Sequence, residues 1–205
     1  MDLNEQAAVA EDLVAGSRKI FFFFGGIAGA IGVPPYEFYR AAKILDHNKV
    51  FIRDLDQAWY QRGVRGIGTD PQAVGEYLRQ KIRDTGASEV CFVGNSMGGF
   101  AALLFCAMLR VGSAIAFAPQ TFISEDKRRL HKDRRWSAQI SSLHASRAAT
   151  DIDDLAPWIA QSYREMPAKV YVPASNVLDE AHANELSAFP CMEIHRHPFA
   201  GHDLV

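Results

Sequence analysis

The chain has 205 residues, 48% hydrophobic and 22% charged, which is enough apolar sequence for one domain with a sizeable core. The 22 Lys and Arg against 24 Asp and Glu give a formal charge of −2, without the basic excess that a nucleic-acid-binding surface needs. The 3 cysteines lack CxxC spacing, which argues against a disulfide framework and favours a reducing, cytoplasmic location. No apolar run reaches the roughly 18 residues that span a bilayer, and the acidic N-terminal segment does not fit a signal peptide.

Short apolar runs alternate along the chain with longer segments of helical spacing. Such runs are typical of parallel strands buried on both faces. The sequence therefore predicts an α/β fold with three layers, in which helices flank a mostly parallel sheet of about six strands, and with ligands at the carboxyl ends of the strands. The expected strands are Lys19–Phe24, Lys49–Ile52, Glu89–Val93, Ser113–Phe117, Lys169–Val172 and Met192–His195.

Three segments between these runs are expected to be helices. Pro35–Leu45 begins with a proline, which suits the first turn of a helix. Pro71–Asp84 places its apolar residues on one face and ends before Gly86, as an amphipathic helix does. Gly98–Leu109 is apolar on nearly every side, which predicts a helix buried against the sheet.

One segment lacks strand-like runs and is strongly charged. We expect a helical lid over residues 121–166, inserted within a single domain that covers residues 1–205. Between Glu125 and Arg135 lie six Lys or Arg residues and three acidic ones, a local excess of 6 − 3 = +3. This excess fits a basic lid that attracts an anionic substrate, and it equally fits a solvated helix face.

The segment Gly94-Asn95-Ser96-Met97-Gly98 follows an expected strand and leads into the buried helix. This is the GxSxG pattern in the strand-turn-helix context that a nucleophile elbow requires. The small residues leave room for a strained turn, and the turn exposes the serine oxygen at the carboxyl edge of the sheet, above a helix N-terminus that favours negative charge. The alternative is a glycine-rich turn that packs a helix closely against a strand.

A serine nucleophile needs a base and an orienting acid, and both residue types occur downstream after strands. The order Ser96, Asp179, His202 resembles that of the α/β-hydrolase superfamily, where the acid follows the penultimate strand and a Gly-His pair follows the last. Asp179-Glu-Ala-His182 also matches the D-x-x-H acid loop of that family, and His182 is then expected to be structural. Rival residues for the acid and base are Asp151, Asp153, Asp154, His195 and His197.

The first long strand ends in Phe24-Gly25-Gly26-Ile27, which looks like the H-G-G type of oxyanion loop with phenylalanine in place of histidine. The resemblance implies that the backbone N–H of Met97 and that of Gly26 or Ile27 stabilise the oxyanion. We expect Trp59, Tyr60 and Gln120, which follow other strands, to line the substrate pocket. For Trp59 and Tyr60, aromatic packing that anchors an ordinary loop explains the sequence equally well.

Two other kinds of site, a dinucleotide site and a metal site, fit the sequence less well than a serine-hydrolase site. Gly26, Gly29 and Gly32, with Asp54 after the next strand, suggest a dinucleotide site, but the glycine spacing is GxxGxxG and not GxGxxG. A metal site built from His195, His197, His202 and Asp203 lacks a second ligand cluster. A third alternative is a non-catalytic protein that keeps the fold and binds a partner. Such a protein would not need all three triad residue types, so their presence argues against this alternative.

The sequence thus predicts a serine hydrolase that acts on a small-molecule carboxylic ester or thioester through an acyl-enzyme, with acyl transfer as the alternative outcome. We expect no cofactor, metal, nucleic-acid partner or membrane partner.

Overall fold

The computed structural model describes residues 7–27, 36–146, 152–162 and 166–198. Within these residues, seven strands form one sheet in the order β1-β3-β2-β4-β5-β6-β7. The strands are β1 (Val9–Asp12), β2 (Lys19–Phe24), β3 (Asn48–Ile52), β4 (Glu89–Asn95), β5 (Ser113–Phe117), β6 (Ala168–Pro173) and β7 (Met192–His197). All six expected strands are confirmed as parallel neighbours, and β1 is an additional edge strand that pairs antiparallel with β3.

The helices are α1 (Pro71–Thr85), α2 (Met97–Leu109), α3 (Glu125–His131), α4 (Ser137–Ala145), α5 (Ala156–Ser162) and α6 (Val177–Asn184), with a 3₁₀ turn, η1 (Ala41–Ile44). The predictions of α1 and α2 are confirmed. Asp70 caps α1 by accepting a hydrogen bond from the Ala73 N–H at 2.7 Å, and Gly86 ends it in the left-handed conformation. Helix α2 is buried along most of its length, as its apolar sequence predicts.

The helix expected over Pro35–Leu45 is wrong for the part that the structure describes. Residues 36–40 form turns, and only Ala41–Ile44 are helical, as a 3₁₀ turn. Phe38 has a φ of 65°, which an α-helix does not accommodate. Pro35 lies outside the described residues.

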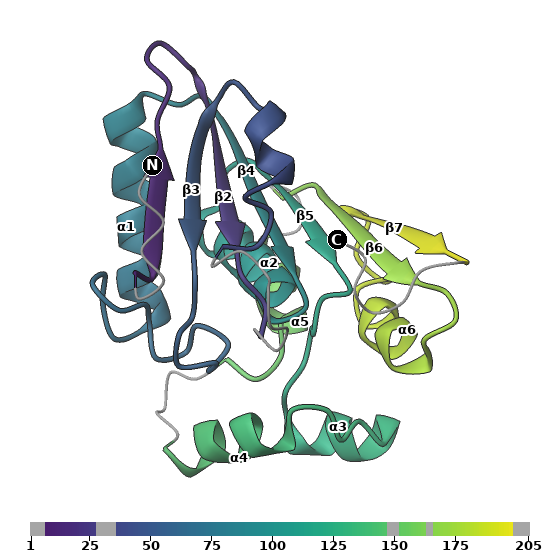
Figure 1. Cartoon of the computed structure of the whole chain (residues 1–205). Coiled ribbons are helices and arrows are strands. Elements are labelled where there is room, and N and C mark those ends of the chain that lie inside the picture. Colours follow the sequence, from purple (N-terminus) through teal and green to yellow (C-terminus); the bar gives the residue numbers. More distant parts are fainter. Residues whose placement is uncertain (1–6, 28–35, 147–151, 163–165, 199–205) are drawn as a thin grey trace.

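Alternation of side chains along the strands divides the core between the two faces of the sheet. Phe22 and Phe24 point to the face that α1, α2 and α5 cover, where the larger cluster lies. Phe23 and Phe51 point to the other face, and Tyr36 and Ala42 of the 36–45 segment cover it. The three layers are therefore helices, sheet and this shorter segment (Figure 1).

The described part of residues 121–166 contains three helices, α3, α4 and α5, joined by turns and irregular segments. An isolated bridge between Phe122 and Asp154 joins the start of the insertion to the segment that precedes α5. Helices α3 and α4 lie beyond the carboxyl ends of the central strands (Figure 1). Helix α5 packs against α2 with its Ile159 fully buried in the main core, and α4 contributes Ile140 and Leu143 to the same cluster.

Candidate active site

Ser96 occupies a strained turn between β4 and α2. Its φ of 53° and ψ of −116° lie outside the regions that residues with a side chain ordinarily adopt. Backbone hydrogen bonds hold the turn: the Ser96 N–H donates to the Phe117 carbonyl at 2.9 Å, and the Ser96 carbonyl accepts from the N–H groups of Phe100 and Gln120 at 3.1 and 3.3 Å. This is the elbow that the GxSxG pattern predicts.

The elbow requires glycine at positions 94 and 98 because neither position has room for a side chain. A side-chain carbon on Gly94 would lie 2.0 Å from the Gly98 carbonyl oxygen, and one on Gly98 would lie 2.1 Å from the Phe24 carbonyl oxygen. Both distances are far below van der Waals contact, so β2, β4 and α2 approach this closely only because these side chains are absent. The elbow thereby comes to lie against the end of β2.

The burial of Ser96 differs from expectation. The residue is 5% exposed, whereas the elbow pattern predicts an exposed hydroxyl. Two described segments lie against the elbow. Gly26, after β2, is adjacent to Ser96, and Gln120, after β5, donates its N–H to the Ser96 carbonyl. A side-chain carbon on Gly26 would lie 3.6 Å from Ser96 Cβ.

The backbone N–H groups expected to bind the oxyanion belong to Met97 in the elbow and to Gly26 or Ile27 after β2. Met97 is the first residue of α2, where N–H groups have no partner within the helix. Gly26 is adjacent to Ser96, but its N–H donates to Glu37 Oε2 at 2.7 Å. Ile27 follows it as the last described residue of the loop, and its backbone N–H has no hydrogen-bond partner among the described residues.

Asp179 lies in the first turn of α6 and is 1% exposed. Its Oδ1 accepts a hydrogen bond from Arg135 Nη1 at 2.6 Å, and Arg135 comes from the segment between α3 and α4. His202, the expected base, lies outside the described residues, as do the rival acid Asp151 and Asp203. The assembly of the triad therefore stays a prediction.

His182 has the structural role expected of it. Its Nδ1 accepts from the Thr121 N–H at 3.1 Å, and its Nε2 lies 3.1 Å from Asp133 Oδ2. An acceptor at Nδ1 fixes the neutral tautomer with the proton on Nε2. Burial lowers the pKa of His182, against the opposing effect of Asp133. Both ring nitrogens are thus engaged, and His182 is not available as a base for Ser96.

Asp133 completes this buried cluster. Arg135 Nη2 donates to Asp133 Oδ2 at 2.8 Å. Burial alone would raise the pKa of Asp133, but the hydrogen bonds from His182 and Arg135 outweigh it and hold the pKa well below its usual range. The cluster of Asp133, Arg135, Asp179 and His182 joins the insertion to α6.

Three of the six basic residues between Glu125 and Arg135 are engaged within the protein, and the other three, Arg129, Lys132 and Arg134, are exposed. Lys127 Nζ lies 2.6 Å from Glu185 Oε2, Arg135 binds two aspartates, and Arg128 donates to the backbone carbonyls of Asp133 and Arg135. These contacts, which the sequence did not reveal, neutralise or bury half of the basic residues. A basic surface that attracts an anionic substrate would therefore depend on the three exposed ones.

The residues expected to line a substrate pocket are buried. Trp59 and Tyr60 are 0% exposed and Gln120 is 3% exposed. Trp59 Nε1 donates to Gln120 Oε1 at 3.1 Å, and the Tyr60 hydroxyl donates to the Gly25 carbonyl at 3.0 Å. These contacts fit the alternative in which both rings anchor their loop.

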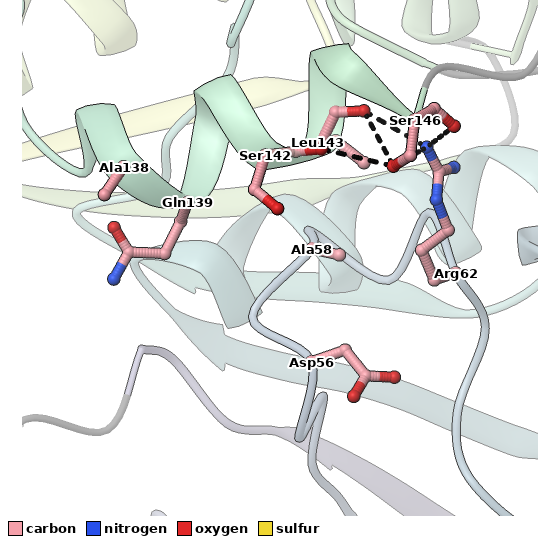
Figure 2. Close-up of a pocket in the computed structure, with 8 residues that line it drawn as sticks. All are labelled: Asp56, Ala58, Arg62, Ala138, Gln139, Ser142, Leu143 and Ser146. Atoms are coloured by element: carbon pink, nitrogen blue, oxygen red, sulfur yellow. Dashed lines mark hydrogen bonds between the residues drawn. The ribbon is translucent and has the colours of Figure 1, made fainter.

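A cavity of about 410 Å³ lies between α4 and the loop after β3. Arg62 crosses one end of it, donating to the carbonyl of Ser146 at 2.6 Å (Figure 2). Ser96 is not among the residues that line this cavity. The residues that line it are Asp56, Ala58, Arg62, Ala138, Gln139, Ser142, Leu143 and Ser146.

The structure describes only some of the residues of the two alternative sites, the dinucleotide site and the metal site. Asp54 accepts from the N–H groups of Ala58 and Tyr60 at 2.7 and 2.8 Å, so backbone donors occupy the carboxylate that a nucleotide ribose would need. His195 stacks on Tyr171 with ring centroids 4.7 Å apart. In the part of the chain that the structure describes, no three His, Cys, Asp or Glu residues are placed to hold a metal ion. None of the described helices is long and apolar enough to cross a membrane.

Neither a family model nor a curated protein matches the sequence, but solved structures match the fold. The capsule O-acetyltransferase of Neisseria meningitidis serogroup A superposes with a TM-score of 0.62 at 11% identity, over 95% of this chain and 84% of the other. Est1E from Butyrivibrio proteoclasticus superposes with a TM-score of 0.59 at 12% identity, over 95% and 85%.

A chain of the glycosylation-associated Gap123 complex from Streptococcus agalactiae also matches, with a TM-score of 0.63 at 15% identity over 92% of this chain. The present chain spans 39% of the length of that protein. Further neighbours include an α/β hydrolase from a marine-lagoon sediment metagenome, with a TM-score of 0.57 at 17% identity over 95% of this chain and 85% of the other. The sheet order, the flanking helices and these neighbours show that the chain has the α/β-hydrolase fold.

Proposed function

We propose that the protein is a serine hydrolase that cleaves a carboxylic ester or thioester through an acyl-enzyme on Ser96. The observation that carries this proposal is the conformation of Ser96, with φ of 53° and ψ of −116° between β4 and α2. A turn of this kind costs about 1 to 3 kcal/mol. A serine that merely filled space would gain nothing from it, whereas a nucleophile gains a hydroxyl held beside a helix N-terminus.

In the proposed reaction, His202 takes the proton from Ser96 Oγ as the oxygen attacks the acyl carbon. The oxyanion is stabilised by the Met97 N–H and one N–H of the loop after β2. Collapse of this intermediate breaks the bond to the alcohol or thiol, which leaves with the proton from His202. Water then attacks the acyl-enzyme by the same route, and the acid is released. Asp179 holds the imidazole of His202 in this scheme.

Acyl transfer is the second candidate, and one observation favours it. A structural neighbour, with a TM-score of 0.62, is the capsule O-acetyltransferase of Neisseria meningitidis serogroup A. Transfer requires the same elbow and differs only in the last step, where a hydroxyl of the acceptor replaces water. The two candidates therefore share Ser96 and are separated by what resolves the acyl-enzyme.

Labelling with a fluorophosphonate tests the nucleophile. We expect the wild-type protein to be modified at Ser96, as located by mass spectrometry of the labelled peptide, and Ser96→Ala to remain unlabelled. Ser113→Ala, in the adjacent strand β5, is the matched control and should label like the wild type. Folded wild-type protein that takes up no label would contradict the proposal.

Turnover of p-nitrophenyl acetate distinguishes hydrolysis from transfer. If water resolves the acyl-enzyme, added methyl glycosides will leave the rate of p-nitrophenol release unchanged and acetate will be the product. If a sugar hydroxyl is the natural acceptor, acetylated glycoside will form at the expense of acetate. Mass spectrometry of the products decides between the two.

A further inference from the structure

The Glu37 carboxylate connects the two loops that carry the expected oxyanion donors. Its Oε2 accepts from the Gly26 N–H at 2.7 Å, and its Oε1 accepts from Asn95 Nδ2 at 2.8 Å. Gly26 belongs to the loop after β2, and Asn95 immediately precedes Ser96. Each carboxylate oxygen thus binds one loop, and the 36–45 segment supplies the bridge.

These two hydrogen bonds are of the stronger kind, because the acceptor is an ionised group and both distances are short. The two hydrogen bonds join Gly26 to Asn95 through Glu37, and both residues lie next to groups of the proposed reaction. Ile27 directly follows Gly26, and Met97 lies two residues beyond Asn95. The bridge therefore fixes the distance between the Ile27 N–H and the Met97 N–H, and fixed donors are what oxyanion stabilisation depends on.

The Gly26 N–H has a partner already, and this decides between the two candidate donors of the loop. A donor bound to a carboxylate at 2.7 Å would have to break a charge-assisted hydrogen bond before it could bind an oxyanion. Ile27 carries the next N–H along the loop, and that group has no hydrogen-bond partner among the described residues.

We propose that Glu37 is a positioning residue that holds the oxyanion loop against the nucleophile elbow, and that the Ile27 N–H, not that of Gly26, is the loop donor to the oxyanion. This inference rests on the proposed function. The same contacts allow an opposite hypothesis, in which Glu37 occupies the oxyanion site as a competing anion. The two hypotheses predict changes of opposite sign when the carboxylate is neutralised.

Glu37→Gln is the first test, with p-nitrophenyl acetate as substrate. An amide keeps one acceptor oxygen and turns an NH₂ group toward the second donor, so one of the two hydrogen bonds is lost. We expect kcat to fall about tenfold to a hundredfold with little change in KM, as a misplaced oxyanion donor predicts. Unchanged or increased kcat would overturn the proposal, and an increase would favour the competing-anion hypothesis.

Glu89→Gln is the matched control. Glu89 begins β4, at the opposite end of that strand from Ser96, and its side chain is 68% exposed beside Lys19. This variant should keep the kcat and KM of the wild type.

Inhibition by phenylboronic acid gives a readout that a general loss of structure would not reproduce. The boronate forms a tetrahedral adduct with serine and places an oxygen where the oxyanion forms. We expect its inhibition constant to rise in Glu37→Gln by about the same factor by which kcat/KM falls, while KM for the ester stays nearly constant. A rise in KM with an unaltered boronate constant would overturn the positioning role.

Exchanging the donor and the acceptor of the hydrogen bond between positions 37 and 95 should restore part of the lost activity. Asn95→Asp alone places two carboxylates against each other and should lower kcat. In the double variant Glu37→Gln with Asn95→Asp, the glutamine amide NH₂ at position 37 donates to the new carboxylate, and the glutamine oxygen still accepts from the Gly26 N–H. We expect the double variant to be more active than either single variant, a coupling that a double-mutant cycle measures. Additive losses would contradict the bridge.

Hydrogen exchange separates failure of this inference from failure of the proposed function. The Gly26 amide should be protected from exchange in the wild type and should lose protection in Glu37→Gln, whatever the protein catalyses. If protection is lost but Ser96 never reacts with a fluorophosphonate, the bridge stands and the proposed function fails. If Ser96 reacts and Gly26 exchanges equally in both proteins, the bridge fails alone.

Discussion

Arg135 Nη1 lies 2.6 Å from Asp179 Oδ1, and this contact ties the helical insertion to the residue expected to be the triad acid. The Asp179 side chain is 1% exposed and that of Arg135 is 21% exposed. The guanidinium also binds Asp133, so it offsets the cost of burying two carboxylates. The insertion thereby takes part in the electrostatics around Asp179.

Replacing Arg135 by alanine is expected to destabilise the fold by about 2 to 4 kcal/mol, because it leaves buried carboxylates without their cation. Urea denaturation monitored by circular dichroism measures the change. Arg129→Ala is the control, since Arg129 and its partner Asp126 are 76% and 95% exposed and such pairs contribute little. Equal stability of the two variants would show that the Arg135 cluster is not stabilising.

The strain at Ser96 predicts an unusual order of stability between two inactive variants. Glycine adopts a φ of 53° and a ψ of −116° at little cost, whereas alanine retains the strain. We expect Ser96→Gly to be more stable than Ser96→Ala by on the order of 1 kcal/mol, while both lose nearly all turnover.

The control for this comparison is Ser113 in β5, where regular strand geometry should make the glycine variant less stable than the alanine variant. Thermal melts of the four proteins test the order. A glycine variant at position 96 that melts below the alanine variant would argue against stored strain at the elbow.

Gly98 is predicted to be intolerant of even one added methyl group. A side-chain carbon there would lie 2.1 Å from the Phe24 carbonyl oxygen, and α2 must then move away from β2. We expect Gly98→Ala to lose about 2 to 3 kcal/mol of stability or to fail to fold. Gly25→Ala in the neighbouring loop is the control, because its nearest atoms would be at 3.7 Å, an ordinary contact. Similar melting temperatures for both variants would contradict the close packing of the elbow.

The lowered pKa of His182 predicts how the free energy of unfolding depends on pH. Burial lowers its pKa below the ordinary value of 6.5, so the folded protein keeps the ring neutral where the unfolded chain binds a proton. The unfolded state then holds more protons below pH 6.5, and stability falls as the pH decreases through that value. Asp133 does not titrate in this range, because its pKa is held well below normal.

His182→Gln removes the titrating group and should flatten the dependence of unfolding free energy on pH between about 6.5 and 5. Denaturation curves at several pH values compare the variant with the wild type. An undiminished slope would mean that other groups cause the acid sensitivity.

Local patterns in the sequence were sufficient for the six parallel strands, for α1 and α2, and for the strained turn at Ser96. Continuous apolar runs predicted the six parallel strands, since strands buried on both faces have no polar face, and glycines around Ser96 predicted the elbow. Strand β1 was missed because Val9–Asp12 pairs along one edge and carries two acids. The helix over Pro35–Leu45 was overpredicted because helical spacing does not reveal the positive φ of Phe38.

What the sequence by itself determined was therefore the fold class and the position of Ser96, because both depend on residues close together in the chain. The tertiary structure alone decided the partners of the charged groups. Glu37 is 58 residues from Asn95, and Arg135 is 44 residues from Asp179. Contacts across such distances follow from how the loops close over the sheet, and no periodicity or motif encodes which carboxylate meets which donor.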